Sequence, residues 1–189
     1  EAERLWRSEA PFYESFLDFV GGDERALLTR RESPTEVPNL YVRASASGLR
    51  ALTSFEHPYP QLADVYKEVV RYRRDDGTDL QATLYLPPGK SPEDGPFPML
   101  MWAYPREFKD ARAAGQMRGS PFRFKSVSVR GPLPLLAAGF AIFDGPTMPI
   151  VGEGDSEPND RYVEQLISSA RAAIDEVVRR GVARRDAIA

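Results

Sequence analysis

Residues 64–189 alternate short, wholly apolar segments with stretches of helical periodicity, and this alternation restricts the possible folds more than any other feature. Residues 99–104 are continuously apolar, and residues 140–144 contain a second apolar run. Such runs are typical of strands covered on both faces. A short helix is predicted between them over 131–139, and a long helix follows over 160–180. This order predicts an α/β domain with a largely parallel sheet covered by helices.

The long helix has the clearest predicted boundaries. Asn159 precedes it as a capping residue, and Gly181 follows two arginines that complement the negative end of the helix dipole. In the short helix, Pro132 suits the first turn and Gly139 suits the C-terminal cap. Apolar residues at helical spacing predict one buried face of the long helix, made of Val163, Leu166, Ile167, Ala170, Ile174, Val177 and Val178.

An antiparallel hairpin is predicted to enter this sheet. Residues 65–73 form a plausible strand, and residues 80–86 alternate apolar and polar side chains after an Asp-Asp-Gly-Thr turn. Residues 105–130 and the later Gly/Pro-rich stretch 145–158 are predicted to be irregular loops. Residues 187–189 are predicted to begin a further strand.

The first part of the chain has a different pattern, and the change falls near residues 58–61. Turn signals rich in Ser, Pro, Asn and Gly separate short segments of strand character, which suggests a meander from a sandwich or a propeller. Only one propeller blade could be built from them, and a single blade needs neighbours to bury both faces. The predicted strands cover residues 12–20, 25–31, 39–43 and 49–53.

Composition argues against several functions. The formal net charge of -3 gives no support for a nucleic-acid or membrane-surface partner. The absence of cysteine excludes disulfides, a Cys nucleophile and thiolate metal sites. Because no apolar run reaches about eighteen residues, no transmembrane helix is expected. The N-terminus lacks the apolar core of a signal peptide and resembles mid-protein sequence, so a cytoplasmic location is expected.

Neither a metal site nor a cofactor is expected. The single histidine, His57, lies in a Pro-punctuated linker without a partner constellation, and we interpret it as a surface or linker residue. Asp155, Glu157 and Asp160 are close in sequence, but an acidic loop that caps the following helix explains them.

Several segments in order resemble the glutamyl endopeptidase-like branch of the prolyl oligopeptidase family of serine peptidases. Residues 101–110, 114–121 and 148–154 resemble loops around the family's oxyanion site. Residues 158–166 resemble the start of the helix before the nucleophile strand, and residues 5–14 resemble the end of the β-propeller. The resemblance implies the end of a propeller domain over 1–57 and the N-terminal part of an α/β-hydrolase domain over 58–189.

The resemblance also implies where the catalytic groups lie. The family's triad runs Ser, Asp, His, with the Ser in a Gly-x-Ser-x-Gly elbow. No such elbow occurs in this sequence, so the triad is expected beyond Ala189. Tyr104 matches the family's Tyr whose hydroxyl stabilises the oxyanion, although Pro105 and Arg106 stand where many relatives have Gly-Gly. The alternative for Tyr104 is a packed side chain whose hydroxyl bonds to backbone.

Arg106 and Arg118 are the candidate substrate-binding residues, because a guanidinium group would suit a substrate with an acidic side chain. The alternative for both is a solvent ion pair with Glu107, Asp110 or another neighbour. Glu153 could orient such an arginine or meet a peptide amine, or it could stabilise its own loop.

The resemblance therefore implies part of a serine peptidase that acts on a peptide substrate and needs the remainder of the parent polypeptide as its partner. An esterase or lipase of the same hydrolase fold and a non-catalytic interaction module are the alternatives. The sequence leaves cleavage specificity and oligomeric state open, including a homo-oligomer.

A polypeptide limited to these 189 residues is expected to be inactive, because it holds neither an elbow Ser nor a suitable His. A fluorophosphonate probe for serine hydrolases should not label it. Stoichiometric labelling of any Ser in this segment would show that the nucleophile has been assigned to the wrong part of the parent protein.

Overall fold

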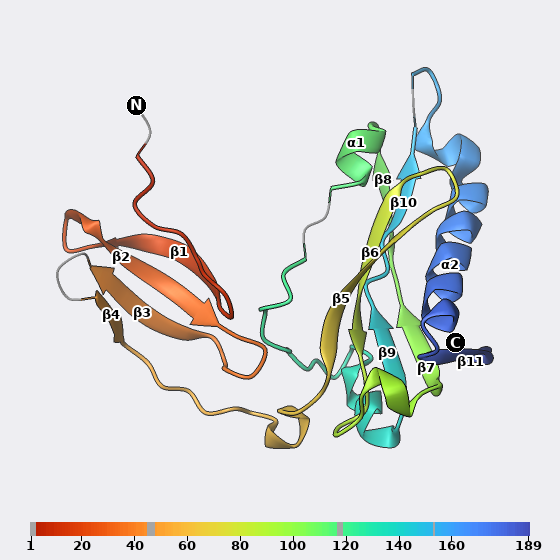
Figure 1. The fold of residues 1–189 in the computed structure, drawn as a ribbon. Coiled ribbons are helices and arrows are strands. Elements are labelled where there is room, and N and C mark those ends of the chain that lie inside the picture. The colour runs from red at the N-terminus through yellow and green to blue at the C-terminus, as the bar shows by residue number, and fades with distance from the viewer. Residues whose placement is uncertain (1–2, 45–47, 117–118, 153) are drawn as a thin grey trace. The chain divides into compact units, whose positions relative to one another are not determined.

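The structure, a computed structural model, describes residues 3–44, 48–116, 119–152 and 154–189 (Figure 1). The chain forms two compact units. The first comprises Glu1–Ala63 and Ser120–Ser126, and the second comprises Asp64–Gly119 and Val127–Ala189. The chain therefore changes unit after Ala63, again after Gly119, and again after Ser126.

The first unit is a four-stranded antiparallel sheet in the order β1-β2-β3-β4. All four strands predicted from the turn signals are present, with small changes at their ends. Their bounds are Tyr13–Val20, Asp23–Glu32, Asn39–Ala44 and Gly48–Ala51.

A buried carboxylate lies inside this sheet. Glu14 on β1 is 8% exposed and accepts hydrogen bonds from the Thr29 hydroxyl at 2.6 Å and from Nη2 of Arg43 at 2.9 Å. The guanidinium group of Arg31 lies 3.2 Å from the centre of the Phe12 ring. Because buried charges are stable only when they are paired, these contacts fix the facing strands in register.

The returning segment Ser120–Ser126 is tied to the first unit by its own side chains and backbone. The Phe124 amide donates to Oε2 of Glu32 at 3.1 Å, and Nζ of Lys125 donates to the Ala63 carbonyl at 3.3 Å. Lys125 is only 4% exposed. This return to the first unit was not predicted, since the segment lies within residues predicted to be an irregular loop.

The second unit is built on a five-stranded sheet in the order β11-β7-β9-β6-β5. β5 and β6 form the predicted antiparallel hairpin, and β6 pairs antiparallel with β9. β7 pairs parallel with both β9 and β11, so it is the central parallel strand. The bounds are Lys67–Arg73 for β5, Asp79–Tyr85 for β6, Phe97–Trp102 for β7, Ala141–Asp144 for β9 and Ala183–Ile188 for β11.

Two short strands pair outside this sheet. β8, Pro105–Phe108, follows β7 almost directly, and β10, Met148–Val151, follows β9. They pair with each other in parallel. The prediction of irregular loop was wrong here, because a proline in each segment, together with the charges of β8, hides the strand pattern.

The helices include one long α-helix, α2, over Tyr162–Arg179, and a single turn, α1, over Ala111–Ala114. The helix predicted over 131–139 is a 3₁₀ helix, because Pro134 inside it has no N–H for an α-helical ladder. Gly139 caps it with a φ of 85°, as predicted. The 3₁₀ helices are η1 (Pro60–Leu62), η2 (Pro92–Asp94), η3 (Leu133–Ala138) and η4 (Pro158–Arg161). None of the described helices is long and apolar enough to cross a membrane.

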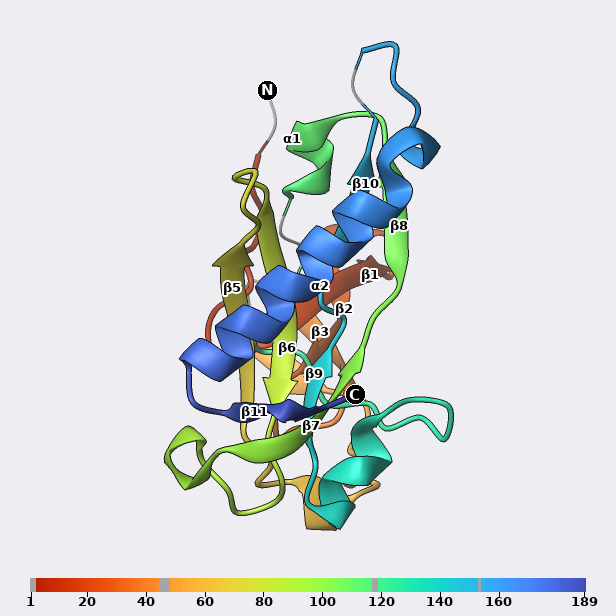
Figure 2. The ribbon, with the colours of Figure 1, turned by 90° about the vertical axis from the view of Figure 1, so that its right-hand side faces the viewer.

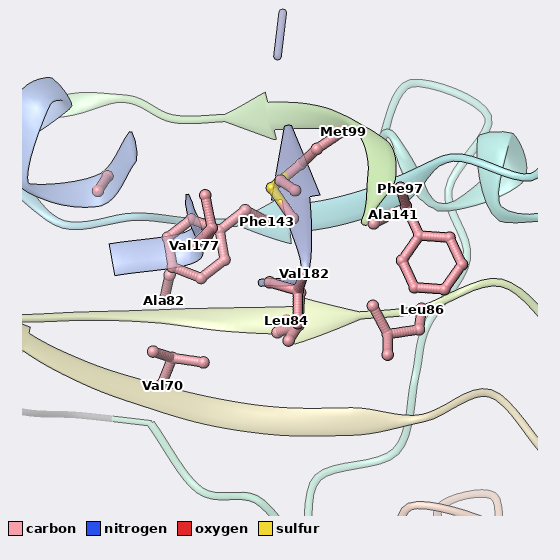
Figure 3. Packing of buried hydrophobic residues seen from close by; sticks show 12 residues of the cluster. Val70, Ala82, Leu84, Leu86, Phe97, Met99, Ala141, Phe143, Val177 and Val182 are labelled. Atoms are coloured by element: carbon pink, nitrogen blue, oxygen red, sulfur yellow. The ribbon is translucent and has the colours of Figure 1, made fainter. Parts of the chain in front are cut away.

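α2 lies across one face of the five-stranded sheet (Figure 2). Side chains from β5, β6, β7 and β9 meet Ala173 and Val177 of α2 in the main apolar cluster, where Phe143, Leu84 and Val70 are fully buried (Figure 3). Two residues of the predicted helix face, Val163 and Ile167, are instead 64% and 52% exposed. The residues that reach the sheet include small ones, which let the helix approach closely.

One buried arginine connects three elements of the second unit. Arg74, directly after β5, is 3% exposed and donates to the Pro149 carbonyl at 3.0 Å and to the Ser169 hydroxyl of α2 at 3.1 Å. It also makes a two-pronged contact with Asp76, at 3.0 and 2.6 Å. These hydrogen bonds hold the pKa of Asp76 well below its usual range. The pairing therefore stabilises the fold above the ordinary Asp pKa and is lost as pH falls through the depressed value.

Replacing Arg74 with Ala should lower the free energy of local opening by roughly 3 kcal/mol, since it leaves the Pro149 carbonyl and Ser169 hydroxyl buried without a partner. Hydrogen exchange at the amides of β10 and α2 measures this opening. The neighbouring Arg73 is a matched control, because its ion pair with Asp79 is exposed to solvent and Arg73→Ala should cost no more than about 1 kcal/mol. Equal exchange in the two variants would contradict the anchoring role of Arg74.

Candidate active site

Tyr104 lies at the junction between the five-stranded sheet and the two-stranded sheet of the second unit. β7 and β9 pair in parallel up to Trp102 and Asp144, and their continuations pair again from Pro105 and Met148. The residues between these two pairings, 103–104 on one side and 145–147 on the other, lie at the carboxyl ends of parallel strands. This edge of an α/β sheet is where ligand sites form.

Backbone contacts hold the second of these connections. The Gly145 amide donates to the Trp102 carbonyl at 2.9 Å, and Gly145 has a φ of 61° that favours glycine. The Thr147 amide donates to the Gln81 carbonyl, while the Gln81 amide donates to the Thr147 hydroxyl, both at 2.9 Å. The turn after β9 is therefore clamped to β6, and this clamp fixes one wall of the junction.

A cavity of about 490 Å³ opens at this junction. It is formed within the second unit by the end of β7, by β8, by α1 and by the turn after β9. The polar residues around it include Gln81, Tyr104, Arg106, Glu107 and Asp144. The size is within the range of small-ligand pockets.

Tyr104 lines this cavity and is 83% exposed. Its hydroxyl has no hydrogen-bond partner among the described residues, so the alternative of a packed Tyr bonded to backbone is not what the structure shows. The side chain is therefore available to a group that enters from solvent.

Arg106 also lines the cavity, and β8 places it opposite Pro149 of β10. Within the described part of the chain it forms no ion pair, with either Glu107 or Asp110. Asp110 instead caps α1 by accepting from the Arg112 amide at 2.8 Å. The other candidate, Arg118, lies outside the described residues, as does Glu153.

The acidic loop before α2 has the capping role predicted for it, with one correction. Glu157 and Asp160 form a reciprocal capping box around η4, and the Glu157 amide donates to Oδ2 of Asp160 at 3.0 Å. The prediction that Asn159 is the capping residue was wrong. Pro158 begins the helical turn, so the capping position falls before it, at Glu157. Across the described ranges, no group of three or more His, Asp and Glu side chains is arranged to hold a metal ion.

Two residues of the cavity were missed by sequence reasoning. Asp144 ends β9, and burial raises the pKa of its carboxyl. Gln81 lies on the neighbouring β6. The signal for Asp144 was present, since it is the acidic residue that directly follows a buried apolar strand. Gln81 carried no signal, because alternating polar residues on a strand predict only an exposed face.

Comparison with known proteins supports a family assignment. The chain is 51% identical over 99% of its length to a protein named probable glutamyl endopeptidase, chloroplastic, from Oryza sativa subsp. japonica, and 50% identical to one of the same name from Arabidopsis thaliana. It spans 21% of the length of each. No protein-family model matches the chain.

Solved structures show the same fold. Oligopeptidase B from Trypanosoma brucei superposes with a TM-score of 0.60 over 97% of this chain and 25% of its own, at 15% identity. A prolyl endopeptidase structure superposes with a TM-score of 0.59 over 93% of this chain and 24% of its own, at 16% identity. The mixed α/β architecture is thus that of prolyl oligopeptidase-type peptidases.

The chain belongs to the prolyl oligopeptidase family. Within that family it is a segment of the glutamyl endopeptidase-like branch, as the two plant relatives show. Both relatives are named chloroplastic, which bears against the cytoplasmic location expected from the sequence.

Proposed function

We propose that the full-length protein containing this chain is a serine peptidase that hydrolyses peptide bonds by acyl transfer, and that this segment supplies its oxyanion loop. The observation that carries the proposal is the position of Tyr104, which is exposed in a cavity at the carboxyl end of the central parallel strand. Attack on a peptide carbonyl places negative charge on its oxygen, and a preorganised hydroxyl donor stabilises that charge.

The topology explains how a nucleophile outside this segment could meet Tyr104. β11 is the parallel neighbour of β7, and the ladder continues to Ala189, whose amide donates to the Met99 carbonyl at 3.0 Å. An elbow that follows β11 would lie beside the residues that follow β7. The strand begins at Ala183, earlier than the predicted 187, because charged residues mask its start.

Arg106 is proposed to select substrates with an acidic side chain. It lines the same cavity as Tyr104, and its guanidinium group is not engaged by any carboxylate in the described ranges. A guanidinium group binds a carboxylate through two parallel hydrogen bonds. The names of the relatives, glutamyl endopeptidase, support the same substrate class. Arg118 remains a second candidate for this role.

We also propose that the first unit is the end of a β-propeller and the second unit is the first part of an α/β-hydrolase domain. The four-stranded antiparallel meander supports the former, and the strand order with β7 at the centre of the parallel strands supports the latter. The division after Ala63, and the return of Ser120–Ser126 to the first unit, refine the simpler division after residue 57.

Tyr104→Phe in the full-length protein should lower kcat roughly 10²–10³-fold with little change in KM, because the lost hydrogen bond forms mainly in the transition state. Thermal stability should not change, since the hydroxyl of this exposed side chain has no partner in the described chain. Tyr72→Phe is the matched control, because the Tyr72 hydroxyl is buried outside the cavity. Wild-type kcat in a folded Tyr104→Phe protein would remove the proposed oxyanion role.

Arg106→Gln should lower kcat/KM for peptides with an acidic residue before the cleaved bond roughly 10–100-fold, since charge-assisted hydrogen bonds are lost. Peptides with Gln at that position should be affected far less. Arg71→Gln, at an exposed site outside the cavity, should change neither rate. An equal effect of Arg106→Gln on both peptides would assign acidic specificity to another residue, with Arg118 the first to test.

A further inference from the structure

Asp144 and Gln81 project from one face of the sheet into the Tyr104 cavity. Asp144 pairs with Thr83 of β6 and with Trp102 of β7, which places all three on the same row of the sheet. Side chains two apart on a strand share a face, so Gln81 lies on that face as the diagonal neighbour of Asp144. The alternating residues Ala82 and Phe143 face α2 on the opposite side, in the apolar cluster. Both Gln81 and Asp144 line the cavity.

Both side chains present oxygen atoms that have no hydrogen-bond donor among the described residues. Within the described part of the chain, Oε1 of Gln81 is buried without a hydrogen-bond partner, and the half-buried carboxyl of Asp144 accepts no hydrogen bond. Buried acceptors without partners are costly and therefore uncommon in folded proteins. One such acceptor beside a half-buried carboxyl that has no donor in the described chain, both lining one cavity, indicates that a donor from outside completes the site.

The other charged groups of the cavity do not satisfy Asp144. Burial is the cause of the raised pKa of its carboxyl, and among the described residues no cation lowers it in return. Arg106, although it lines the same cavity, therefore does not neutralise Asp144, and Glu107 and Tyr104 are no source of positive charge. Tyr85 lies on the same face of β6 as Gln81, and its pKa is raised by burial and by the nearby charge of Asp144. The cavity thus has a cationic group at Arg106 and a separate acceptor region at Asp144 and Gln81.

We infer that Asp144 and Gln81 form an acceptor floor that binds a main-chain N–H group of the peptide substrate while Tyr104 receives the oxyanion. The inference rests on the proposed peptidase function and adds a residue pair that positions the substrate backbone. A neutral amide suits this floor better than a cationic amine, because Arg106 in the same cavity would repel a cation. Peptide backbones supply such N–H groups at every residue except proline.

The test uses the full-length protein and an acidic peptide in which one backbone N–H at a time is replaced by an ester oxygen, away from the cleaved bond. At one position the wild-type protein should lose roughly 10–100-fold in kcat/KM, as expected for a hydrogen bond to a charged acceptor. In the Asp144→Ala variant, kcat/KM for the all-amide peptide should fall to a similar level. The difference in kcat/KM between the all-amide peptide and that ester analogue should then disappear. Gln81→Leu, which keeps the side-chain volume, should reduce the same difference in kcat/KM.

Stability separates this positioning role from a structural one. The pKa of Asp144 is raised in the folded state, so ionisation of this carboxyl destabilises the fold. This destabilisation is present at neutral pH and absent below the ordinary Asp pKa. Asp144→Asn should therefore unfold at the same or a higher temperature than wild type at pH 7. A lower unfolding temperature would make Asp144 a structural residue and overturn the inference.

Glu164→Gln is the control, because Glu164 is exposed on α2 and lies outside the cavity, and it should keep the wild-type ratio of amide to ester rates. The same wild-type ratio in both Asp144→Ala and Gln81→Leu would overturn the acceptor floor while leaving the proposed peptidase function intact. A wild-type protein that hydrolyses none of the acidic peptides would overturn the proposed function, and the inference with it.

Discussion

The pairing of β7 with a parallel strand on each side is the constraint on which the site depends. Phe97 and Met99 of β7 are buried in the cluster with α2, and that burial holds the strand between β9 and β11. A central strand cannot slip by one residue without turning its apolar side chains to the wrong face. Tyr104, two residues beyond the end of β7, therefore occupies a fixed place at the edge of the sheet although its own side chain is exposed.

The cavity itself results from a change of partners along two strands. After Trp102 and Asp144 the ladder of the main sheet stops, and β8 and β10 resume the pairing a few residues later. The interruption leaves room for side chains that would otherwise be covered. Arg74 secures the far wall through the Pro149 carbonyl on β10, so a residue far from Tyr104 in sequence helps to keep this opening in shape.

The elements that the sequence predicts well are those whose side chains are sorted by burial. The hairpin, the buried strands and α2 follow periodic patterns because one or both faces meet the apolar cluster. The strands β8 and β10 escape prediction because each is only four residues long and contains a proline, so neither shows a strand pattern of its own. Val163 and Ile167 were wrongly assigned to the buried face of α2, because apolar character alone does not say which face of a helix meets the sheet.

The candidate site divides in the same way. Tyr104 and Arg106 could be proposed from a resemblance that matches local sequence. Asp144 and Gln81 belong to strands separated by sixty residues, and only the register that brings Thr83 opposite Asp144 makes them neighbours. Sequence patterning carries no information on that register in the absence of coordinates. The buried contacts of Glu14 are hidden in the same way, because its hydrogen-bond donor Thr29 and its ion-pair partner Arg43 lie on separate strands.

The chain passes between its two units three times, and this limits how the protein can be divided into fragments. A polypeptide begun after Ala63 would still carry Ser120–Ser126 but would lack Glu32 and the Ala63 carbonyl, which the Phe124 amide and Lys125 contact. Lys125 would then lose the acceptor that the Ala63 carbonyl supplies. A recombinant form of the second unit would therefore need either the first unit in full or a shortened link between Gly119 and Val127. Recombination at Ala63 would separate most of the first unit from Ser120–Ser126, the seven residues that complete it. The exchanged parts would therefore have to be compatible with each other at this segment.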